Sequence, residues 1–422
     1  MSRAQASLWR HRDFRLLWGG ETISHFGSAI SAIALPLVAV TTLAVTPFQM
    51  GILTSAETAA FLLVGLPAGA WLDRMRRRPV MLAADVARGV LLASIPLAWW
   101  AGMLSYEQLL VVALATGVAT VFFDVAYQSY LPSLVGREVL IEGNSKLEST
   151  RSLAQVTGPA VGGGLVQLLG ATMAVLVDAV SYLVSAVALA AVRTHEPQPA
   201  PAEHPRLRSQ IAEGLQFVLR HRLLRAIAAC TGSFNLFNGV QMAVIILFLA
   251  RELGLSAGTI GLLFTAGGIG GLLGAVTSAW WARRVGQARI IWLSTLVTSP
   301  FGLLIPLAEP GWRIGLIFLA DLVIGYGVVV YNVAQVSFRQ AICPDRLLGR
   351  MNASVRFLVW GTLPLGGLIG GVLGEWLGIR GALWVAMAGQ SVAVAWVLAS
   401  PLRTMRDLPQ TDEPADPTPA TA

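Results

Sequence analysis

Apolar runs of about 20 residues follow one another along almost the whole chain, separated by short turns or charged bends. In lipid, only helices and closed barrels satisfy every backbone polar group. Charged residues make up 13% of the chain, against about 25% in soluble domains. The chain is therefore expected to be an all-α polytopic membrane protein. Twelve spans are predicted, at 15–44, 49–71, 79–101, 106–131, 147–169, 171–192, 224–250, 256–281, 289–308, 312–338, 350–377 and 379–400.

A polar segment divides these spans into two six-helix bundles. The expected parts are a cytoplasmic N-terminal segment (1–14), a first bundle (15–192), a linker (193–223), a second bundle (224–400) and a disordered, Pro-rich cytoplasmic tail (401–422). The start of the linker is rich in Pro and Ala and should be flexible. From Ser209 to Arg225 the linker should form an amphipathic helix at the membrane surface, with one apolar face formed by Ile211, Leu215, Val218 and Leu219.

The basic residues indicate how the chain is oriented. If the N-terminus is cytoplasmic, all 30 Lys and Arg residues fall in cytoplasmic segments except Arg88, inside a span, and three in outer loops, Arg251, Arg313 and Arg380. This bias predicts an N-in, C-in topology. Because the net charge of +7 is spread over separate segments, no nucleic-acid partner is expected.

The sequence contains no signature of catalysis or metal binding. Cys230 lies in an apolar run and Cys343 in a basic loop, so no disulfide is expected, and no metal-ligand spacing occurs. There is no phosphate-binding Gly-Lys-Ser/Thr loop and no nucleophile elbow. We expect no enzymatic activity, no cofactor and no bound nucleotide, so the energy for any transport must come from an ion gradient.

The two halves contain matching segments. RSLAQVTGPAVGGG, from Arg151, and RFLVWGTLPLGGLIGG, from Arg356, both place a proline eight residues after the arginine. GAWLDRMRRR, from Gly69, aligns with SAWWARRVGQ, where Ala282 stands in place of Asp73. Two repeated six-span halves predict a transporter with a cleft between its bundles.

These residues resemble the major facilitator superfamily of secondary transporters, and within it the bacterial efflux branch of macrolide and enterobactin exporters. The resemblance spans all twelve predicted helices and is carried by FRLLWGGETISHFGSAI, GAWLDRMRRRPVML, YLPSLVGREVLIEGNSKLESTRSL and GPAVGG. One departure is Arg76, where the family usually has Gly. The resemblance implies a monomer in the inner (plasma) membrane that exports small hydrophobic or amphipathic compounds (drug, macrolide or siderophore-like) by proton-coupled alternating access.

The bend after the second span carries the motif of most interest. Gly69 lets another helix approach. The resemblance implies that Asp73, an arginine of the bend and Asp124 form a cytoplasmic charge cluster that holds the inner gate closed. The candidate arginines are Arg74, Arg77 and Arg78. The alternative is that these arginines only set the topology.

A second charged pair lies in the third span. Asp85 and Arg88 are three residues apart and share a helix face. They should form a local ion pair, or belong to the same gate network.

Glycines mark the expected contacts between helices. In GPAVGG, Gly158 and Gly162 share a face, Pro159 should kink the helix, and Gly163 follows. The family's fold packs spans five and eight across the interface between bundles. The resemblance therefore implies that Gly158, Pro159 and Gly162 let the bundles rock. Plain tight packing is the alternative.

Ionisable groups inside spans are functional candidates by default. Glu57 and Asp321 come first, followed by Asp178 and Glu21. Such an acid could carry a proton or bind a cationic substrate, or it could simply be hydrogen-bonded to a neighbouring helix. His25 is expected to be a packing or capping residue.

Other functions remain open on the same fold. The substrate could be a lysophospholipid or another lipid entering sideways from the membrane. A non-transporting receptor is less favoured, because the linker and tail are too short for an added domain. Sugar uptake would require more polar side chains in the cleft.

Overall fold

The computed structural model describes residues 8–72, 75–136, 139–194, 196 and 207–407, except for the side chains at 66, 69, 70, 141, 207–212, 345, 346, 348 and 349. This described part is helical throughout and contains no strand. The first half comprises η1 (Leu8–Arg10), α1 (Arg12–Leu37), η2 (Val38–Thr42), α2 (Pro47–Leu72), α3 (Arg77–Trp100), α4 (Tyr106–Val135), α5 (Leu140–Leu169) and α6 (Ala171–Ala190). The second half comprises α7 (Leu207–Arg220), α8 (Arg222–Leu247), η4 (Phe248–Glu252), α9 (Ala257–Val285), α10 (Gln287–Thr298), η5 (Ser299–Leu307), η6 (Trp312–Ile314), α11 (Gly315–Ile342), α12 (Asp345–Trp360), α13 (Thr362–Trp376), α14 (Gly378–Val392), α15 (Ala395–Leu398) and η7 (Pro401–Arg403).

The predicted all-helical membrane fold is confirmed. Within the described residues, 11 helical segments are long and apolar enough to cross a membrane, and they coincide with eleven of the twelve predicted spans. The remaining predicted span, 147–169, lies in α5. The first half of this helix carries Glu142, Lys146, Glu148 and Arg151, and its second half is rich in Gly, which lowers its mean hydropathy. The helix packs between α1 and α9. The count of twelve and the N-in, C-in orientation stay predictions.

The two halves are built on one plan with a constant offset along the chain. Helices α1 and α8, α2 and α9, and α3 and α10 begin at corresponding positions. His11 precedes α1 and His221 precedes α8, and each accepts a backbone N–H through its Nδ1 atom. This offset matches position 73 with Arg283, one residue beyond the Ala282 that the sequence alignment suggested. In either register the second half has no acid there.

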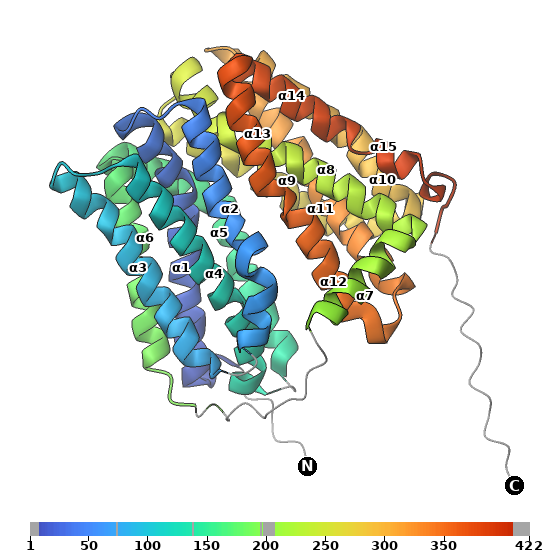
Figure 1. The fold of residues 1–422 in the computed structure, drawn as a ribbon, viewed down its shortest axis with the longest axis horizontal. Coiled ribbons are helices and arrows are strands. Elements are labelled where there is room, and N and C mark those ends of the chain that lie inside the picture. Colours follow the sequence, from blue (N-terminus) through green and yellow to red (C-terminus); the bar gives the residue numbers. More distant parts are fainter. Residues whose placement is uncertain (1–7, 73–74, 137–138, 195, 197–206, 408–422) are drawn as a thin grey trace, which may run out of the picture.

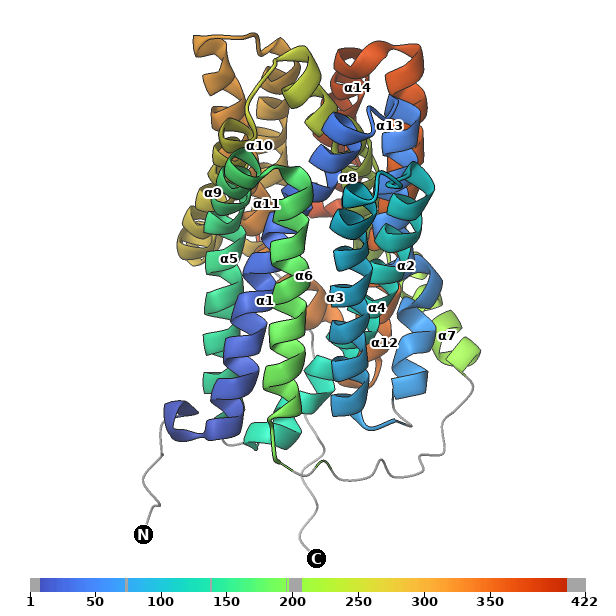
Figure 2. The same cartoon turned by 90° about the vertical axis from the view of Figure 1, so that its left-hand side faces the viewer.

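The two bundles meet at one end of the molecule and diverge towards the other (Figure 1). We call the end that carries η1 and η7 the terminal end, and the opposite end the far end. Figure 2 shows the first bundle in front, with its helices upright and η1 at the terminal end. One hydrophobic core runs through both bundles near the far end, whereas separate cores fill each bundle towards the terminal end. Apolar burial between the bundles is therefore concentrated at the far end.

The amphipathic linker helix is present as α7, but it packs on α12. Val218 is fully buried in a cluster with Leu224 and Met351. A side chain on Gly214 would come within 2.6 Å of the Arg350 carbonyl oxygen, and Glu213 pairs with the Arg350 guanidinium. The helix ends at Arg220, earlier than predicted. Its apolar face therefore covers protein at Val218, while its position at a membrane surface stays a prediction.

Candidate functional site

The first far-end contact between bundles joins α5 and α9 through glycines. A Cβ on Gly163 would lie 2.9 Å from Gly261 Cα, and a Cβ on Gly261 would lie equally close to Gly163 Cα. The Pro159 carbonyl oxygen also faces Gly261. Such backbone contact is possible only because both residues lack side chains.

The second far-end contact joins α2 and α13 and corresponds to the first in the repeat. A Cβ on Gly51 would lie 2.6 Å from Gly371 Cα, and one on Gly367 would lie 3.1 Å from the Gly51 carbonyl oxygen. Nearby, Ser55 Oγ donates to the Pro364 carbonyl at 2.8 Å. The bundles thus touch along two glycine-lined crossings.

These crossings correct the predicted roles within GPAVGG. Gly158 and Gly162 face α1 of their own bundle, where a Cβ on Gly162 would lie 3.0 Å from Ile30 Cα. Only Pro159 and Gly163 face the other bundle. The reason is helical geometry, since positions 158 and 162 share one face and positions 159 and 163 share the next.

Polar contacts reinforce the far-end closure. Arg251 of the second bundle donates to the carbonyls of Val45, at 2.8 Å, and Val40, at 3.1 Å, in the first. Gln167 Oε1 accepts from the Gly258 amide at 3.1 Å. Each of these bonds joins one half of the chain to the other.

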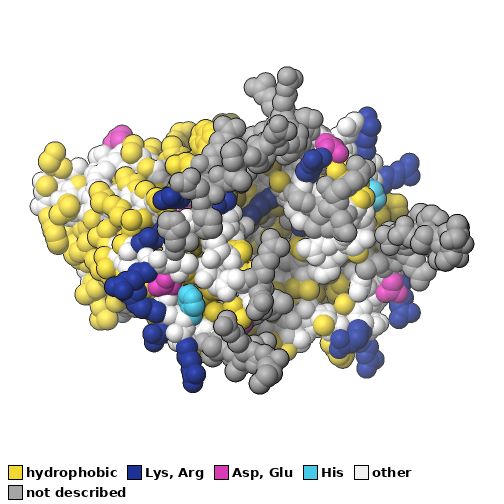
Figure 3. All heavy atoms as spheres, turned by 90° about the horizontal axis from the view of Figure 1, so that it is seen from below, with side chains coloured by type: hydrophobic (Ala, Val, Ile, Leu, Met, Phe, Trp, Pro, Cys, Tyr) yellow, Lys and Arg dark blue, Asp and Glu magenta, His cyan; other side chains and the backbone are white. Residues whose placement is uncertain are grey.

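Towards the terminal end, a groove of about 260 Å³ lies between the bundles. Its walls come from α2 and α4 on one side and α12 on the other, and they include Phe61, Asp124, Arg356 and Trp360. The Arg356 guanidinium lies 5.4 Å from the ring centre of Phe61 and 5.3 Å from that of Trp360. Figure 3 shows this end hollowed between two lobes, with Lys and Arg side chains around it.

A buried cation occupies the middle of the first bundle. Arg88 is 4% exposed and pairs with Asp85, which is 0% exposed. The guanidinium carbon lies 4.4 Å from the Phe123 ring centre and 4.1 Å from that of Tyr182. Asp85 Oδ2 and Arg88 Nε are buried and have no hydrogen-bond partner among the described residues. The two rings and the ion pair together hold a charge that would otherwise be costly in this interior.

Glu21 lies beside this cation. Its side chain is buried, Oε1 has no hydrogen-bond partner in the described part of the chain, and Oε2 lies 3.6 Å from His25 Nε2. Asp85, Arg88 and Asp124 are all close enough to act on it electrostatically. His25 is therefore placed against an acid instead of serving as a helix cap.

The other acids predicted inside spans differ in their surroundings. Asp178 is buried and accepts from Ser181 Oγ at 3.0 Å. This bond lies within α6, whereas the alternative foreseen for these acids was a bond to a neighbouring helix. Glu57 and Asp321 are half-buried, and neither side chain has a hydrogen bond or ion pair with a described residue. Both lie where their helix crosses a glycine of its neighbour, Gly117 for Glu57 and Gly267 for Asp321.

Two arginines of the bend, Arg77 and Arg78, have partners that the sequence did not suggest. The Arg77 and Arg78 amides donate to the Glu196 carboxylate at 2.6 and 3.1 Å. The Arg78 side chain donates to the carbonyls of Leu189, at 3.0 Å, and Ala190, at 2.6 Å. Glu196 therefore caps the start of α3, and Arg78 caps the end of α6. The sequence analysis did not single out Glu196, because its partners lie more than a hundred residues earlier.

The remaining members of the predicted gate are only partly placed. Asp73 and Arg74 lie outside the described residues, as does the environment of Gly69, which is within α2. Asp124 is half-buried and acted on electrostatically by Arg88, Arg151 and Arg356. A latch between Asp73 and Asp124 stays a prediction.

The second bundle repeats the cap at α3 with different chemistry. At the start of α10, the Arg406 carbonyl accepts from the Ala288 amide at 3.0 Å and from the Arg289 amide at 3.4 Å. Arg406 corresponds to Glu196 under the constant offset of the repeat. The segment that leaves each bundle thus returns to satisfy free N–H groups at the start of the third helix.

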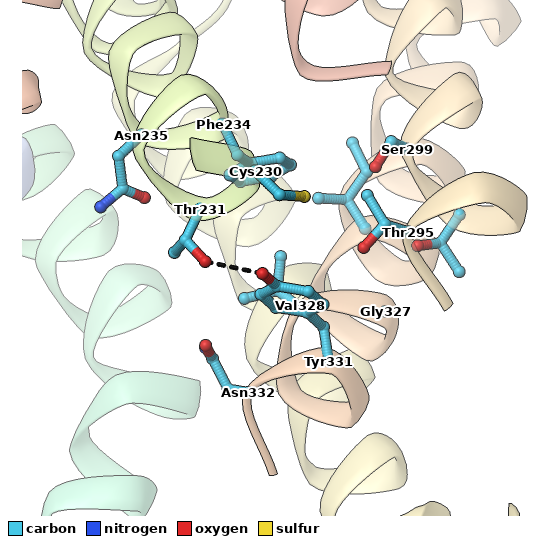
Figure 4. Close-up of a pocket in the computed structure, with 12 residues that line it drawn as sticks. Cys230, Thr231, Phe234, Asn235, Thr295, Ser299, Gly327, Val328, Tyr331 and Asn332 are labelled. Carbon is cyan, nitrogen blue, oxygen red and sulfur yellow. Dashed lines mark hydrogen bonds between the residues drawn. The ribbon is translucent and has the colours of Figure 1, made fainter. Parts of the chain in front are cut away.

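A small polar pocket of about 60 Å³ lies inside the second bundle, between α8, α10 and α11. Thr231 and Tyr331 share a 2.6 Å hydrogen bond across it, and Cys230 and Asn235 lie on the same side as Thr231 (Figure 4). Small-molecule sites usually enclose about 300–1,000 Å³, so this pocket suits water better than a substrate. Thr231 and Asn235 correspond in the repeat to Glu21 and His25 of the first bundle.

The two cysteines, both buried, do not form a disulfide. Across the described residues, no three His, Cys, Asp or Glu side chains gather as metal ligands would.

Comparison with known sequences identifies relatives along nearly the full length. A family profile described as transmembrane secretion effector matches residues 4–420. The enterobactin exporter EntS of Escherichia coli O1:K1 / APEC is 29% identical over 393 residues, which cover 91% of this chain and 88% of that protein. EntS of Citrobacter koseri shows the same identity and coverage.

Solved transporter structures share the fold at low sequence identity. The nucleoside transporter NupG superposes with a TM-score of 0.74 at 12% identity, covering 92% of this chain and 98% of NupG. A bacterial homologue of the iron transporter ferroportin in its inward-facing state gives 0.72 at 16% identity, over 92% of this chain and 98% of the homologue. The structure of a bacterial ferroportin homologue in an outward-facing state gives a TM-score of 0.59 at 17% identity, covering 92% of this chain and 98% of that homologue.

Proposed function

Because this chain belongs to the transmembrane secretion effector family of the major facilitator superfamily, we propose that it exports small hydrophobic or amphipathic compounds in exchange for protons. Its family and fold are those of secondary transporters with several membrane spans. We further propose that it works as a monomer in the inner (plasma) membrane, with the terminal end in the cytoplasm. The distribution of Lys and Arg supports this orientation.

One observation carries the proposal, namely that the bundles touch at the far end and leave a groove between them towards the terminal end. Alternating access requires two states in which opposite ends are closed. The described arrangement corresponds to a state open towards the cytoplasm. The higher TM-score with the inward-facing ferroportin homologue supports this assignment.

Glu21 is our first candidate for the proton carrier. Its carboxylate is buried next to Arg88, with one oxygen unpartnered. A buried acid with an unpartnered oxygen is less costly to bury neutral than charged. Proton binding and release at Glu21 would therefore change the charge that Arg88 experiences, and so couple protons to the arrangement of the first bundle. Glu57 and Asp321 are the next candidates, since neither has a partner among the described residues.

The test uses cells that lack their own exporters. They are loaded with a panel of labelled drugs, macrolides, siderophores and lysophospholipids, with and without a protonophore. Export that stops when the proton gradient collapses supports the proposal, and export of lysophospholipids alone would favour a lipid flippase. Lack of export for the whole panel would contradict it.

Purified protein in liposomes then tests the proton carrier. Glu21→Gln should abolish substrate-driven proton movement while substrate exchange without a gradient continues. Glu107→Gln, an exposed acid near the far end, is the matched control and should behave as wild type. Unchanged proton movement in Glu21→Gln would exclude Glu21 as the carrier.

A further inference from the structure

The groove between the bundles contains an arginine without an acidic partner. Arg356 of α12 is exposed in the groove wall. No carboxylate of a described residue lies within ion-pair distance of it. Its guanidinium instead lies beside both the Phe61 ring of the first bundle and the Trp360 ring of the second, and these two rings contact each other with centres 4.9 Å apart. An arginine so placed keeps its hydrogen-bond donors free for a ligand.

Among the described residues, more arginines than acids act on the groove wall opposite Arg356. Asp124, on that opposite wall, is the one acid among the described residues that line the groove. Three guanidinium groups, those of Arg88, Arg151 and Arg356, act on Asp124, and among the described carboxylates Glu21 also interacts with it. Arg88 already has Asp85 as its partner, whereas Arg151 and Arg356 form no ion pair with a described residue. The Arg356 side of the groove would therefore attract an anion.

The walls also favour a flat, apolar body. Besides Phe61 and Trp360, the groove is lined by Phe357, Val121 and Leu62. Aromatic rings stack on one another and on guanidinium planes. At about 260 Å³, the groove approaches the volume of typical small-molecule sites, about 300–1,000 Å³.

From this geometry we propose that the groove binds amphipathic organic anions with an aromatic ring, and that Arg356 receives their acidic group while Phe61 and Trp360 stack on the ring. The inference rests on the proposed export function for its biological meaning, but binding is a separate property. Because Phe61 and Trp360 come from different bundles and contact each other, a ligand seated against this pair would contact both halves at once.

Equilibrium binding to the purified full-length protein in detergent tests this inference. The probes are radiolabelled 2-naphthoate and the matched cation (naphthalen-2-yl)methylammonium, with protein-free micelles as background. We expect wild type to prefer the anion. Arg356→Gln should weaken anion binding about tenfold or more, as expected for the loss of a charge-assisted contact, and Arg356→Lys should weaken it less. Asp124→Asn should strengthen anion binding.

The matched control is Arg284→Gln. Arg284 also stacks on a tryptophan, with its guanidinium 5.5 Å from the Trp280 ring centre, but it lies at the end of α9 and does not line the groove. Equal anion affinities in Arg356→Gln and Arg284→Gln would overturn the inference, as would tighter binding of the cation by wild type. The melting temperature of each variant establishes that it is folded. If Arg356→Gln does not fold, the other two variants test the inference, because Arg356→Lys should weaken anion binding and Asp124→Asn should strengthen it.

Binding and transport results separate the two proposals. Anion binding that depends on Arg356, in a protein that exports nothing, would refute export and leave the binding site standing. Proton-driven export of cations only, unaffected by Arg356→Gln, would support export and overturn the anion site.

Discussion

Replacing Gly163 with alanine should open the far end of the molecule. A Cβ at this position would lie 2.9 Å from Gly261 Cα and 3.0 Å from Gly261 N, and still closer to the Ala257 carbonyl. These atoms belong to the backbone of α9 and cannot rotate away, so α5 and α9 must separate. Forcing an extra carbon into a packed contact typically costs about 1–3 kcal/mol. If the contact exists only in the state with the far end closed, this cost shifts the equilibrium towards the other state by about 5- to 150-fold.

The neighbouring glycine provides a matched control. A Cβ on Gly164 would meet nothing within 4 Å. Both substitutions raise the helix propensity of α5 by about 1 kcal/mol, and that gain is common to the two states. Only Gly163→Ala should therefore change the conformational equilibrium.

The assay measures the separation of the bundles at the far end by double electron–electron resonance. Spin labels go on Met103→Cys and Trp312→Cys, because these side chains are 75% and 82% exposed in far-end loops of different bundles. The native cysteines are buried and should remain unlabelled. Gly163→Ala should raise the population of long distances, and Gly51→Ala should do the same at the second crossing, where its Cβ would lie 2.6 Å from Gly371 Cα. Distance distributions identical to that of Gly164→Ala in both variants would refute the reasoning.

Three further perturbations test other contacts. Glu196→Ala removes the cap of α3 and should destabilise the protein by about 1–2 kcal/mol, seen as a lower melting temperature; no change would show that the cap is dispensable. Asp85→Asn leaves the Arg88 charge buried without its partner and should lower the free energy of unfolding by about 3–5 kcal/mol. The double variant Asp85→Asn with Arg88→Gln should be more stable than this single variant, and a double variant of lower stability would contradict this account. Arg251→Gln removes hydrogen bonds to two carbonyls of the other bundle and should increase far-end opening in the spin-label assay. Arg313→Gln breaks an exposed ion pair near its own position in the chain and should not do so, and equal effects of the two variants would argue against a stabilising role for the Arg251 bonds.

The glycine motif illustrates how far the sequence could go. GPAVGG correctly marks a segment of close helix contact, because small residues are what such contacts require. The sequence could not say which neighbour each glycine faces. Gly162 and Gly163 are adjacent in the chain, yet one lies against α1 and the other against α9. A rotation of α5 by one residue would exchange these neighbours, and no local pattern determines that rotation.

The charged residues show the same division. The sequence predicts the bend, its basic character and the Asp85–Arg88 pair, because these follow from neighbours within a few positions. It missed Glu196 as the cap of α3, and it did not single out Arg356 as a residue of the groove. Their partners come from distant parts of the chain, namely Arg77 for Glu196 and Phe61 for Arg356.

By itself the sequence determined the helical membrane fold and the repeat of two halves, because hydropathy and turn residues act locally and lipid permits few alternatives. The tertiary structure decided which end is closed and which charges share a groove. It also decided that Arg78 binds the end of α6, at Leu189 and Ala190. The physical reason is that these properties depend on how rigid helices rotate and tilt against one another. That arrangement is set by the sum of many weak contacts between residues far apart in the chain.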